Sequence, residues 1–211
     1  MLISHSHKIT SISVPKTGST SLHYALMSHL KIKFHMKNSA PALYHLSAED
    51  IARIMGPGKF AAYFSFGVVR NPYDRMVSLF HDFCDQRQAI KAETFDDFLI
   101  HHFRQSWKDN VHFLPQSYFL CRGTEVMVDK AYRYEDSLET ALHDIGERAG
   151  FRVEGIGHAR KSERGSWQEY YRNPQVIEIV NAAYDEDFGI FGYDRIDPKQ
   201  ATEKEAGTGR G

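Results

Sequence analysis

The chain has 211 residues, 42% of them hydrophobic and 25% charged, and its formal net charge is −1. This length suffices for one α/β domain with a substantial core, and the ordinary composition argues against a disordered chain and a membrane protein. The balanced charge also argues against general binding to nucleic acid, so an anion site would need locally placed Lys and Arg side chains.

The cysteines and histidines do not indicate a metal site or a disulfide framework. Cys84 and Cys121 stand in apolar settings and are predicted to be buried free thiols of a reducing compartment, although the sequence leaves a disulfide between them open. The twelve histidines are scattered, without the carboxylates and the spacing of a metal site, so no metal is expected. No apolar run approaches the roughly 20 residues that span a bilayer.

The first elements frame a turn that suits a phosphate group. Residues 9–14 alternate apolar side chains and predict a strand, while Leu22, Leu26 and Leu30 mark one face of a helix. Backbone N–H groups and the positive dipole end at the start of such a helix favour an anion, as does a nearby ammonium group. The alternative is a Ser/Thr-rich helix cap that binds nothing. The turn itself consists of Pro15, Lys16, Thr17, Gly18, Ser19, Thr20 and Ser21.

A loop and a capped helix follow the first helix. Residues 32–35 are compatible with a short second strand, and His45 lies in the loop behind it. Ser47 then caps a predicted helix over 48–55, which ends at a Gly-Pro-Gly sequence.

The next strand places an arginine at the edge of the sheet. Residues 61–69 are nearly all apolar, as expected of a central parallel strand that is covered on both faces. Arg70 follows at the C-terminal end, where open α/β sheets bind ligands. Pro72 opens a helix that carries Ser78 about two turns along, on a face that can look back towards Arg70. The alternative role for Arg70 is a structural salt bridge, for example with Asp74.

The second half of the chain alternates helices with short strands. Predicted helices cover 94–104, run from Ser137 to near Gly150, and begin at Pro174; predicted strands cover 125–128 and 131–134. Residues 106–122 are interpreted mainly as packing, and 151–165 as a loop. Residues 1–196 are expected to form a single domain, and 197–211 a disordered tail.

Two of these motifs together resemble the nucleotide-binding signatures of PAPS-dependent sulfotransferases. The sequence from Pro15 to Leu22 resembles their 5′-phosphosulfate loop, and Arg70-Asn71-Pro72-Tyr73-Asp74-Arg75 resembles part of their 3′-phosphate site. The chain is most similar to the Golgi-type carbohydrate sulfotransferases, over most of residues 9–193. The resemblance implies a three-layer α/β sandwich with a central parallel sheet, like that of P-loop NTPases.

The resemblance also assigns roles to individual residues. Lys16 is the expected electrostatic catalyst at the bridging oxygen of the leaving group. The 5′-phosphate is expected to be held by Lys16, Thr17, Gly18, Ser19, Thr20 and Ser21. The 3′-phosphate is expected to be held by Arg70 and Ser78, which suits the chemistry of a guanidinium and a hydroxyl.

Two weaker matches support the same nucleotide. Tyr134-Glu135-Asp136 resembles the end of a strand in cytosolic sulfotransferases, where the tyrosine meets the adenine. The run from Arg160 to Trp167, which includes Lys161, Arg164 and Gly165, resembles their loop over the 3′-phosphate. Ser162 stands in place of the first glycine of that loop, which changes its backbone contacts. A packing tyrosine and a solvated basic loop are the alternatives.

The general base is predicted to be a histidine. In the Golgi-type relatives a histidine lies between the first helix and the strand that leads to the 3′-phosphate arginine, and His45 occupies a similar place. Imidazole titrates near neutral pH and can accept a hydroxyl proton. Glu135, His112 and His35 are the alternatives.

The sequence therefore predicts metal-free, in-line transfer of a sulfuryl group from PAPS to an acceptor hydroxyl, with PAP as the product. A carbohydrate acceptor is implied by the resemblance alone. Golgi members carry a membrane anchor, and no such segment is visible here, so the chain is predicted to be a cytoplasmic relative or an excised catalytic domain. Its oligomeric state cannot be inferred from the sequence.

Two other functions are compatible with parts of the pattern. A P-loop kinase of small molecules would use ATP and Mg²⁺, but Lys16 precedes the only glycine of the turn, whereas a Walker A lysine follows the second glycine. A binding module for PAP or PAPS without turnover would keep the nucleotide pocket, and retention of Lys16 and a base argues against it.

Overall fold

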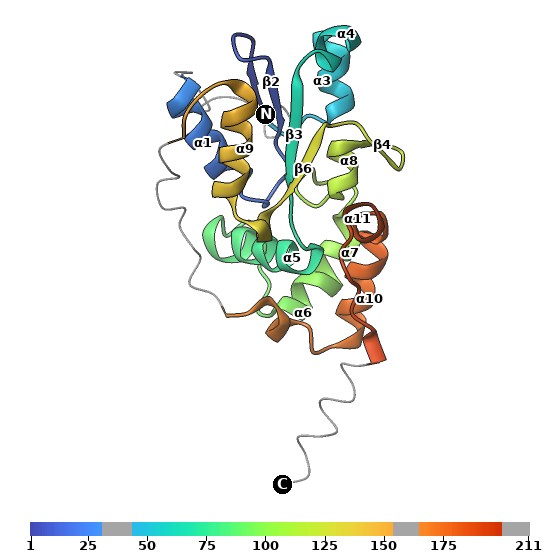
Figure 1. The fold of residues 1–211 in the computed structure, drawn as a ribbon. Helices are drawn as coiled ribbons and strands as arrows, with labels where there is room; N and C mark the ends of the chain where they lie inside the picture. The colour runs from blue at the N-terminus through green and yellow to red at the C-terminus, as the bar shows by residue number, and fades with distance from the viewer. Residues whose placement is uncertain (31–43, 154–164, 200–211) are drawn as a thin grey trace. The chain divides into compact units, whose positions relative to one another are not determined.

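The computed structural model describes residues 1–30, 44–153 and 165–199, which are drawn as a coloured ribbon in Figure 1. The chain divides into two compact units. The first unit comprises Met1–Arg70 and Gln116–Lys161, and the second comprises Asn71–Pro115 and Ser162–Gly211. A single domain over 1–196 stays a prediction. The tail expected at 197–211 lies outside the described residues from position 200 onward.

The first unit contains a mixed, mainly parallel sheet of four strands within the described residues. The strands, in spatial order, are β1 (Leu2–Ser4), β2 (Ile9–Ile12), β3 (Phe64–Val69) and β6 (Lys130–Arg133). β2, β3 and β6 are parallel, and β1 pairs with β2 in the antiparallel direction. The predicted fold class is confirmed, although β1 was not expected from the sequence.

Helices cover both faces of this sheet (Figure 1). On one face, α1 (Ser19–Leu30) and α9 (Leu138–Ala149) bury their leucines against Phe66 and Val68 of β3. On the other face lies α8 (Gln116–Leu120), whose Leu120 fills the space beside Gly67. Added at Gly67, a Cβ atom would lie 2.5 Å from Leu120 Cδ2, so this glycine permits the close approach of α8 to β3.

The predicted helix caps are present in the first unit. Ser47 Oγ accepts a hydrogen bond from the Asp50 N–H, and the Asp50 carboxylate accepts from the Ser47 N–H, which completes a capping box on α3 (Ala48–Met55). Ser137 caps α9, and Gly150 ends that helix in the left-handed conformation.

Several predicted boundaries differ from those of the structure. The expected strand over 61–69 starts only at Phe64, because Pro57 opens a further short helix, α4 (Pro57–Ala61), instead of ending α3 in a loop. The strand expected over 125–128 is the shorter β5 (Glu125–Val126), which pairs with β4 (Cys121–Arg122) in a separate hairpin. The possible strand at 32–35 lies outside the described residues.

The second unit is helical around an aromatic core. Its core includes Tyr73, Phe98, Phe113, Tyr184 and Phe188. The helix predicted over 94–104 is present as a continuous helical run whose middle part has π geometry. The helical elements of this unit are α5 (Pro72–Phe80), η1 (His81–Gln86), α6 (Phe95–Asp97), η2 (Phe98–Phe103), α7 (Arg104–Ser106), η4 (Trp167–Tyr170), α10 (Pro174–Ala183) and α11 (Asp185–Phe191).

Neither Cys84 nor Cys121 forms a disulfide, and the predicted burial is confirmed for Cys121, whereas Cys84 is partly exposed. Burial raises the pKa of the Cys84 thiol, and the neighbouring Asp85 carboxylate raises it further. Among the described residues, none of the helices is long and apolar enough to cross a membrane.

Candidate active site

The turn between β2 and α1 is held in shape by its own hydroxyl groups. Thr17 Oγ1 and Ser19 Oγ both donate to the carbonyl oxygen of Val14, at 3.1 and 2.9 Å. Lys16 and Gly18 adopt φ angles of 63° and 79° in the left-handed region, which costs energy at the lysine but not at the glycine. The turn therefore has a defined, locally strained backbone.

The start of α1 presents N–H groups that the helix itself cannot satisfy. The helix begins at Ser19, and the N–H of Leu22 donates to the Gly18 carbonyl at 3.2 Å. The N–H groups of Ser19, Thr20 and Ser21 thus belong to the first turn, where no intrahelical acceptor exists and the helix dipole is positive. This arrangement suits an anionic oxygen.

Arg70 brings the second motif to this turn. It follows β3 and is only 7% exposed. Its Nη1 donates to the carbonyl oxygen of Lys16 at 3.2 Å, and its guanidinium carbon lies 4.3 Å from the ring centroid of Tyr134. Residues from three separate sequence motifs, Lys16, Arg70 and Tyr134, therefore meet at one place within the first unit.

Gly18 also packs against Tyr134. A Cβ atom at this position would lie 2.9 Å from both Tyr134 Cε2 and Leu138 Cδ1, closer than real contacts allow. The absence of a side chain at Gly18 therefore lets the ring of Tyr134 lie directly against the turn.

His45 forms a hydrogen bond with the segment that links β2 to the same turn. Its Nδ1 lies 2.8 Å from the carbonyl oxygen of Ser13. Because a carbonyl oxygen only accepts hydrogen bonds, Nδ1 carries the proton, and the lone pair of the neutral ring is on Nε2. This tautomer is the one that a general base acting through Nε2 requires.

A second histidine lies close to His45 in the first unit. His23 Nε2 is 2.7 Å from Ser11 Oγ. Burial is the main cause that lowers the pKa of His23 to about 3, and the charged forms of the Met1 amino group and of His45 contribute to the same shift. His23 is therefore neutral near pH 7.

A family model described as "Sulfotransferase family" matches residues 1–194. The chain belongs to the sulfotransferase family. Its structure is similar to that of a sulfotransferase from Alicyclobacillus acidocaldarius, with a TM-score of 0.50 and 14% sequence identity over 89% of this chain and 96% of the other. At 14% sequence identity this similarity supports a shared fold and nothing more specific. No curated protein matches the sequence.

The alternative bases of this sulfotransferase have different surroundings. His112 lies in the second unit and is buried, with Nδ1 3.2 Å from Asn110 Oδ1 and Nε2 3.5 Å from the guanidinium group of Arg87. These contacts place His112 within the packing of the second unit. Glu135 is exposed in η3 (Tyr134–Asp136), directly after Tyr134. His35 lies outside the described residues.

Two residues predicted to bind the nucleotide belong to the second unit. Ser78 is partly exposed on α5, on the same face as Asp74, while most other residues of that helix are buried. Gly165 precedes η4 and lies against Glu169. Because Arg70 belongs to the first unit, its pairing with Ser78 stays a prediction. Arg160, Lys161 and Arg164 lie outside the described residues.

The sulfotransferase motifs of the second unit also meet. The indole of Trp167, at the end of the predicted basic loop, stacks on the ring of Tyr73 with centroids 5.5 Å apart and an interplanar angle of 9°. Tyr171 Oη donates to the carbonyl oxygen of Tyr73 at 2.9 Å. The end of that loop is therefore anchored on the first turn of α5.

Sequence reasoning missed two buried polar residues. The Gln116 side chain forms two hydrogen bonds with the main chain of Arg70. Arg75 is fully buried, and its Nη2 donates to the carbonyl oxygens of His112 at 3.0 Å and Leu114 at 2.9 Å. Arg75 stands inside a motif and was visible in the sequence, whereas a single long-range pair such as Gln116 with Arg70 leaves no local pattern.

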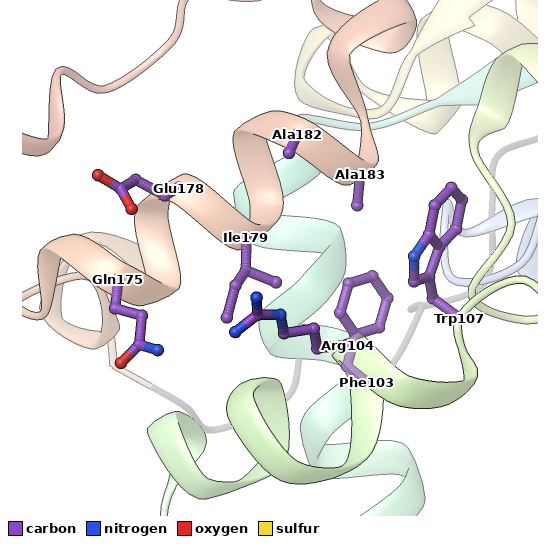
Figure 2. Close-up of a pocket in the computed structure, with 8 residues that line it drawn as sticks. All are labelled: Phe103, Arg104, Trp107, Gln175, Glu178, Ile179, Ala182 and Ala183. Atoms are coloured by element: carbon purple, nitrogen blue, oxygen red, sulfur yellow. The ribbon is translucent and has the colours of Figure 1, made fainter.

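The second unit of the sulfotransferase also has an open groove of about 600 Å³ between the η2–α7 segment and α10. Figure 2 shows Arg104 extending into this groove beneath Ile179. None of the lining residues was predicted as a site residue. They are Phe103, Arg104, Trp107, Gln175, Glu178, Ile179, Ala182 and Ala183. Within the described parts of the chain, no group of three or more His, Cys, Asp or Glu side chains could hold a metal ion.

Proposed function

We propose that this sulfotransferase uses PAPS as the donor and transfers its sulfuryl group to an acceptor hydroxyl, with PAP as the product. The observation that carries this proposal is the meeting of Lys16, Arg70 and Tyr134 within one unit. A helix start, an ammonium and a guanidinium that faces an aromatic ring are the groups that a bisphosphorylated adenosine would need. When bound, PAPS supplies an activated sulfuryl group on a phosphate leaving group.

The start of α1 and Lys16 are proposed to hold the 5′-phosphate end. The N–H groups of Ser19, Thr20 and Ser21 donate to its oxygens, and the ammonium group of Lys16 neutralises charge that develops on the leaving oxygen. Thr17 and Gly18 complete the turn. Since this charge grows during transfer, the contact of Lys16 strengthens in the transition state.

Arg70 and Tyr134 are proposed to hold the other end of the nucleotide. A guanidinium can donate two parallel hydrogen bonds to a phosphate while its face remains on an aromatic ring. We place the 3′-phosphate at Arg70 and the adenine near Tyr134, with Ser78 and the residues from 160 to 165 as further proposed contacts.

His45 is proposed to act as the general base. Its Nδ1 proton is engaged with the Ser13 carbonyl, so Nε2 would accept the proton of the acceptor hydroxyl as the oxygen attacks sulfur in line. We further propose that the hydroxyl belongs to a carbohydrate, which is supported only by the similarity of the motifs to the Golgi-type branch. A cytoplasmic location remains a prediction.

Calorimetric titration tests the donor assignment. The protein is titrated with PAP and, separately, with ATP plus Mg²⁺, and the same titrations are repeated with Arg70→Ala. Metal-independent binding of PAP that Arg70→Ala weakens, with little response to ATP, is the expected result. Binding of ATP and Mg²⁺ without binding of PAP would overturn the proposal in favour of a kinase. PAP binding without transfer from labelled PAPS to any sugar hydroxyl would instead favour a binding module without turnover.

A further inference from the structure

The side chain of Gln116 holds both main-chain polar groups of Arg70. The Arg70 N–H donates to Gln116 Oε1 at 2.8 Å, and Gln116 Nε2 donates to the Arg70 carbonyl oxygen at 2.9 Å. Gln116 is completely buried, and Arg70 is only 7% exposed. A side-chain amide thus replaces the two hydrogen bonds that a neighbouring strand would make.

The position of Arg70 explains why it needs such a partner. The parallel pairing of β3 with β6 ends at Val69 opposite Arg133, so Arg70 is the first residue beyond the ladder. Its N–H and C=O are buried and lie beyond the pairing of the described strands, and burial of main-chain polar groups is costly unless they form hydrogen bonds. Gln116, the first residue of α8, supplies both the acceptor and the donor.

The same pair lies where the chain passes between its two units. The chain leaves the first unit after Arg70 and returns to it at Gln116. The hydrogen bonds therefore connect the two ends of the intervening segment 71–115 inside the first unit. They fix the backbone of Arg70 directly after the end of β3 and of its pairing with β6.

We propose that Gln116 is a positioning residue for sulfuryl transfer. By fixing the main chain of Arg70, it holds the guanidinium beside the Lys16 carbonyl and the Tyr134 ring, the position from which Arg70 is proposed to bind the 3′-phosphate. This inference rests on the proposed function of Arg70 in binding PAPS. In this proposal Gln116 acts through Arg70 and not by direct contact with the nucleotide or the acceptor.

The chemistry of the pair requires an amide of this length. Methionine has a similar size, but its thioether sulfur is only a weak acceptor for the Arg70 N–H and it has no donor for the Arg70 C=O. An ionised glutamate accepts from the Arg70 N–H, but its second oxygen faces the Arg70 carbonyl, and two acceptors repel. Protonation of that glutamate restores a donor, so Gln116→Glu is a pH-dependent version of the same contact.

The main test compares Gln116→Met with the unaltered protein and with Gln105→Met, a matched change at an exposed position of α7. We expect Gln116→Met to weaken PAP binding about tenfold, the order of one lost buried hydrogen bond. KM for PAPS should rise with kcat nearly unchanged, because Arg70 binds ground state and transition state alike. Hydrogen exchange of the Arg70 amide should become faster. Gln105→Met should change none of these.

Gln116→Glu allows a pH-dependent measurement that distinguishes a positioning role from a purely structural one. The ratio of its PAP affinity to that of the unaltered protein is measured between pH 7.5 and 5.5, with Gln105→Glu as the control for added charge. We expect the ratio to rise as the pH falls, because the protonated carboxyl regains the hydrogen bond to the Arg70 carbonyl. A reduced ratio that does not change with pH would count against the proposal.

The positioning role is overturned if folded Gln116→Met binds PAP as tightly as the unaltered protein does. If the unaltered protein binds no PAP, the proposed function fails and the positioning role fails with it. Amide exchange at Arg70 then still shows whether the two hydrogen bonds exist, so the two failures are distinguishable.

Discussion

The ring of Tyr134 occupies the space that a Cβ atom on Gly18 would need. Such an atom would lie 2.9 Å from Tyr134 Cε2, and the same ring faces the guanidinium of Arg70 on another side at 4.3 Å. The turn, the arginine after β3 and the tyrosine after β6 are therefore packed as one group. A change at Gly18 must disturb the backbone of the turn and the tyrosine together.

Gly18→Ala is expected to lower the free energy of unfolding by about 2–4 kcal/mol, the sum of left-handed strain and steric displacement. Gly123→Ala is the matched control, because Gly123 also has a positive φ, 58°, but nothing within 4 Å of a Cβ atom. The control should lose only about 1–2 kcal/mol. Urea unfolding of both variants measures the difference. Equal losses of unfolding free energy in the two variants would show that the side chains of Tyr134 and Leu138 can move aside without an energetic cost.

Lys16→Ala should separate turnover from binding. If the ammonium group acts on charge that grows in the transition state, kcat falls by about 10²–10³, while PAP affinity changes far less. Steady-state rates and PAP titrations of the variant are compared with those of Lys91→Ala, which removes a lysine from an exposed position. A proportional loss of PAP affinity would instead assign Lys16 to ground-state binding.

His45→Asn tests the base while keeping the contact with Ser13. The asparagine amide can still donate to the Ser13 carbonyl, but no basic nitrogen remains at the position of Nε2. We expect kcat to fall by about 10²–10⁴ with PAP affinity unchanged. His101→Asn, at an exposed position of η2, should leave kcat as it is. Normal turnover of His45→Asn would move the search for the base to Glu135.

The parts of the fold that could be predicted from the sequence depend on local patterns. The strand before the turn, the leucine face of α1, the capping box at Ser47 and the end of α9 at Gly150 are each encoded within a few neighbouring residues. The placement of Arg70 directly after a buried strand also followed from local hydrophobicity. Resemblance to known motifs then assigned the roles that these patterns alone do not specify.

The features that were missed depend on contacts between distant residues or on unusual backbone choices. β1 has only three residues, and the hairpin to β2 turns through Lys8 with φ 50° where glycine or asparagine would signal a turn. Gln116 pairs with Arg70 across a long stretch of sequence, and no periodicity marks such a pair. Pro57 follows the glycine that ends α3, and it opens a second helix instead of a loop.

His23 gives a prediction for the pH dependence of folding. Its pKa is about 3 in the folded protein, mainly because of burial, and about 6.5 for an unperturbed histidine. Between these values the unfolded chain binds a proton that the folded chain does not, so stability is complete above pH 6.5 and falls as the pH drops towards 3.

From pH 7.5 to 5.5 the His23 contribution should fall by about 1.4 kcal/mol. His23→Gln removes the titrating group, and its amide can still form a hydrogen bond with Ser11, so the variant should lose less stability over this range than the unaltered protein. Urea unfolding at both pH values gives the two changes, and their difference cancels other titrating groups. Equal changes would mean that His23 is protonated in the folded protein as readily as in the unfolded chain, contrary to its burial beside His45.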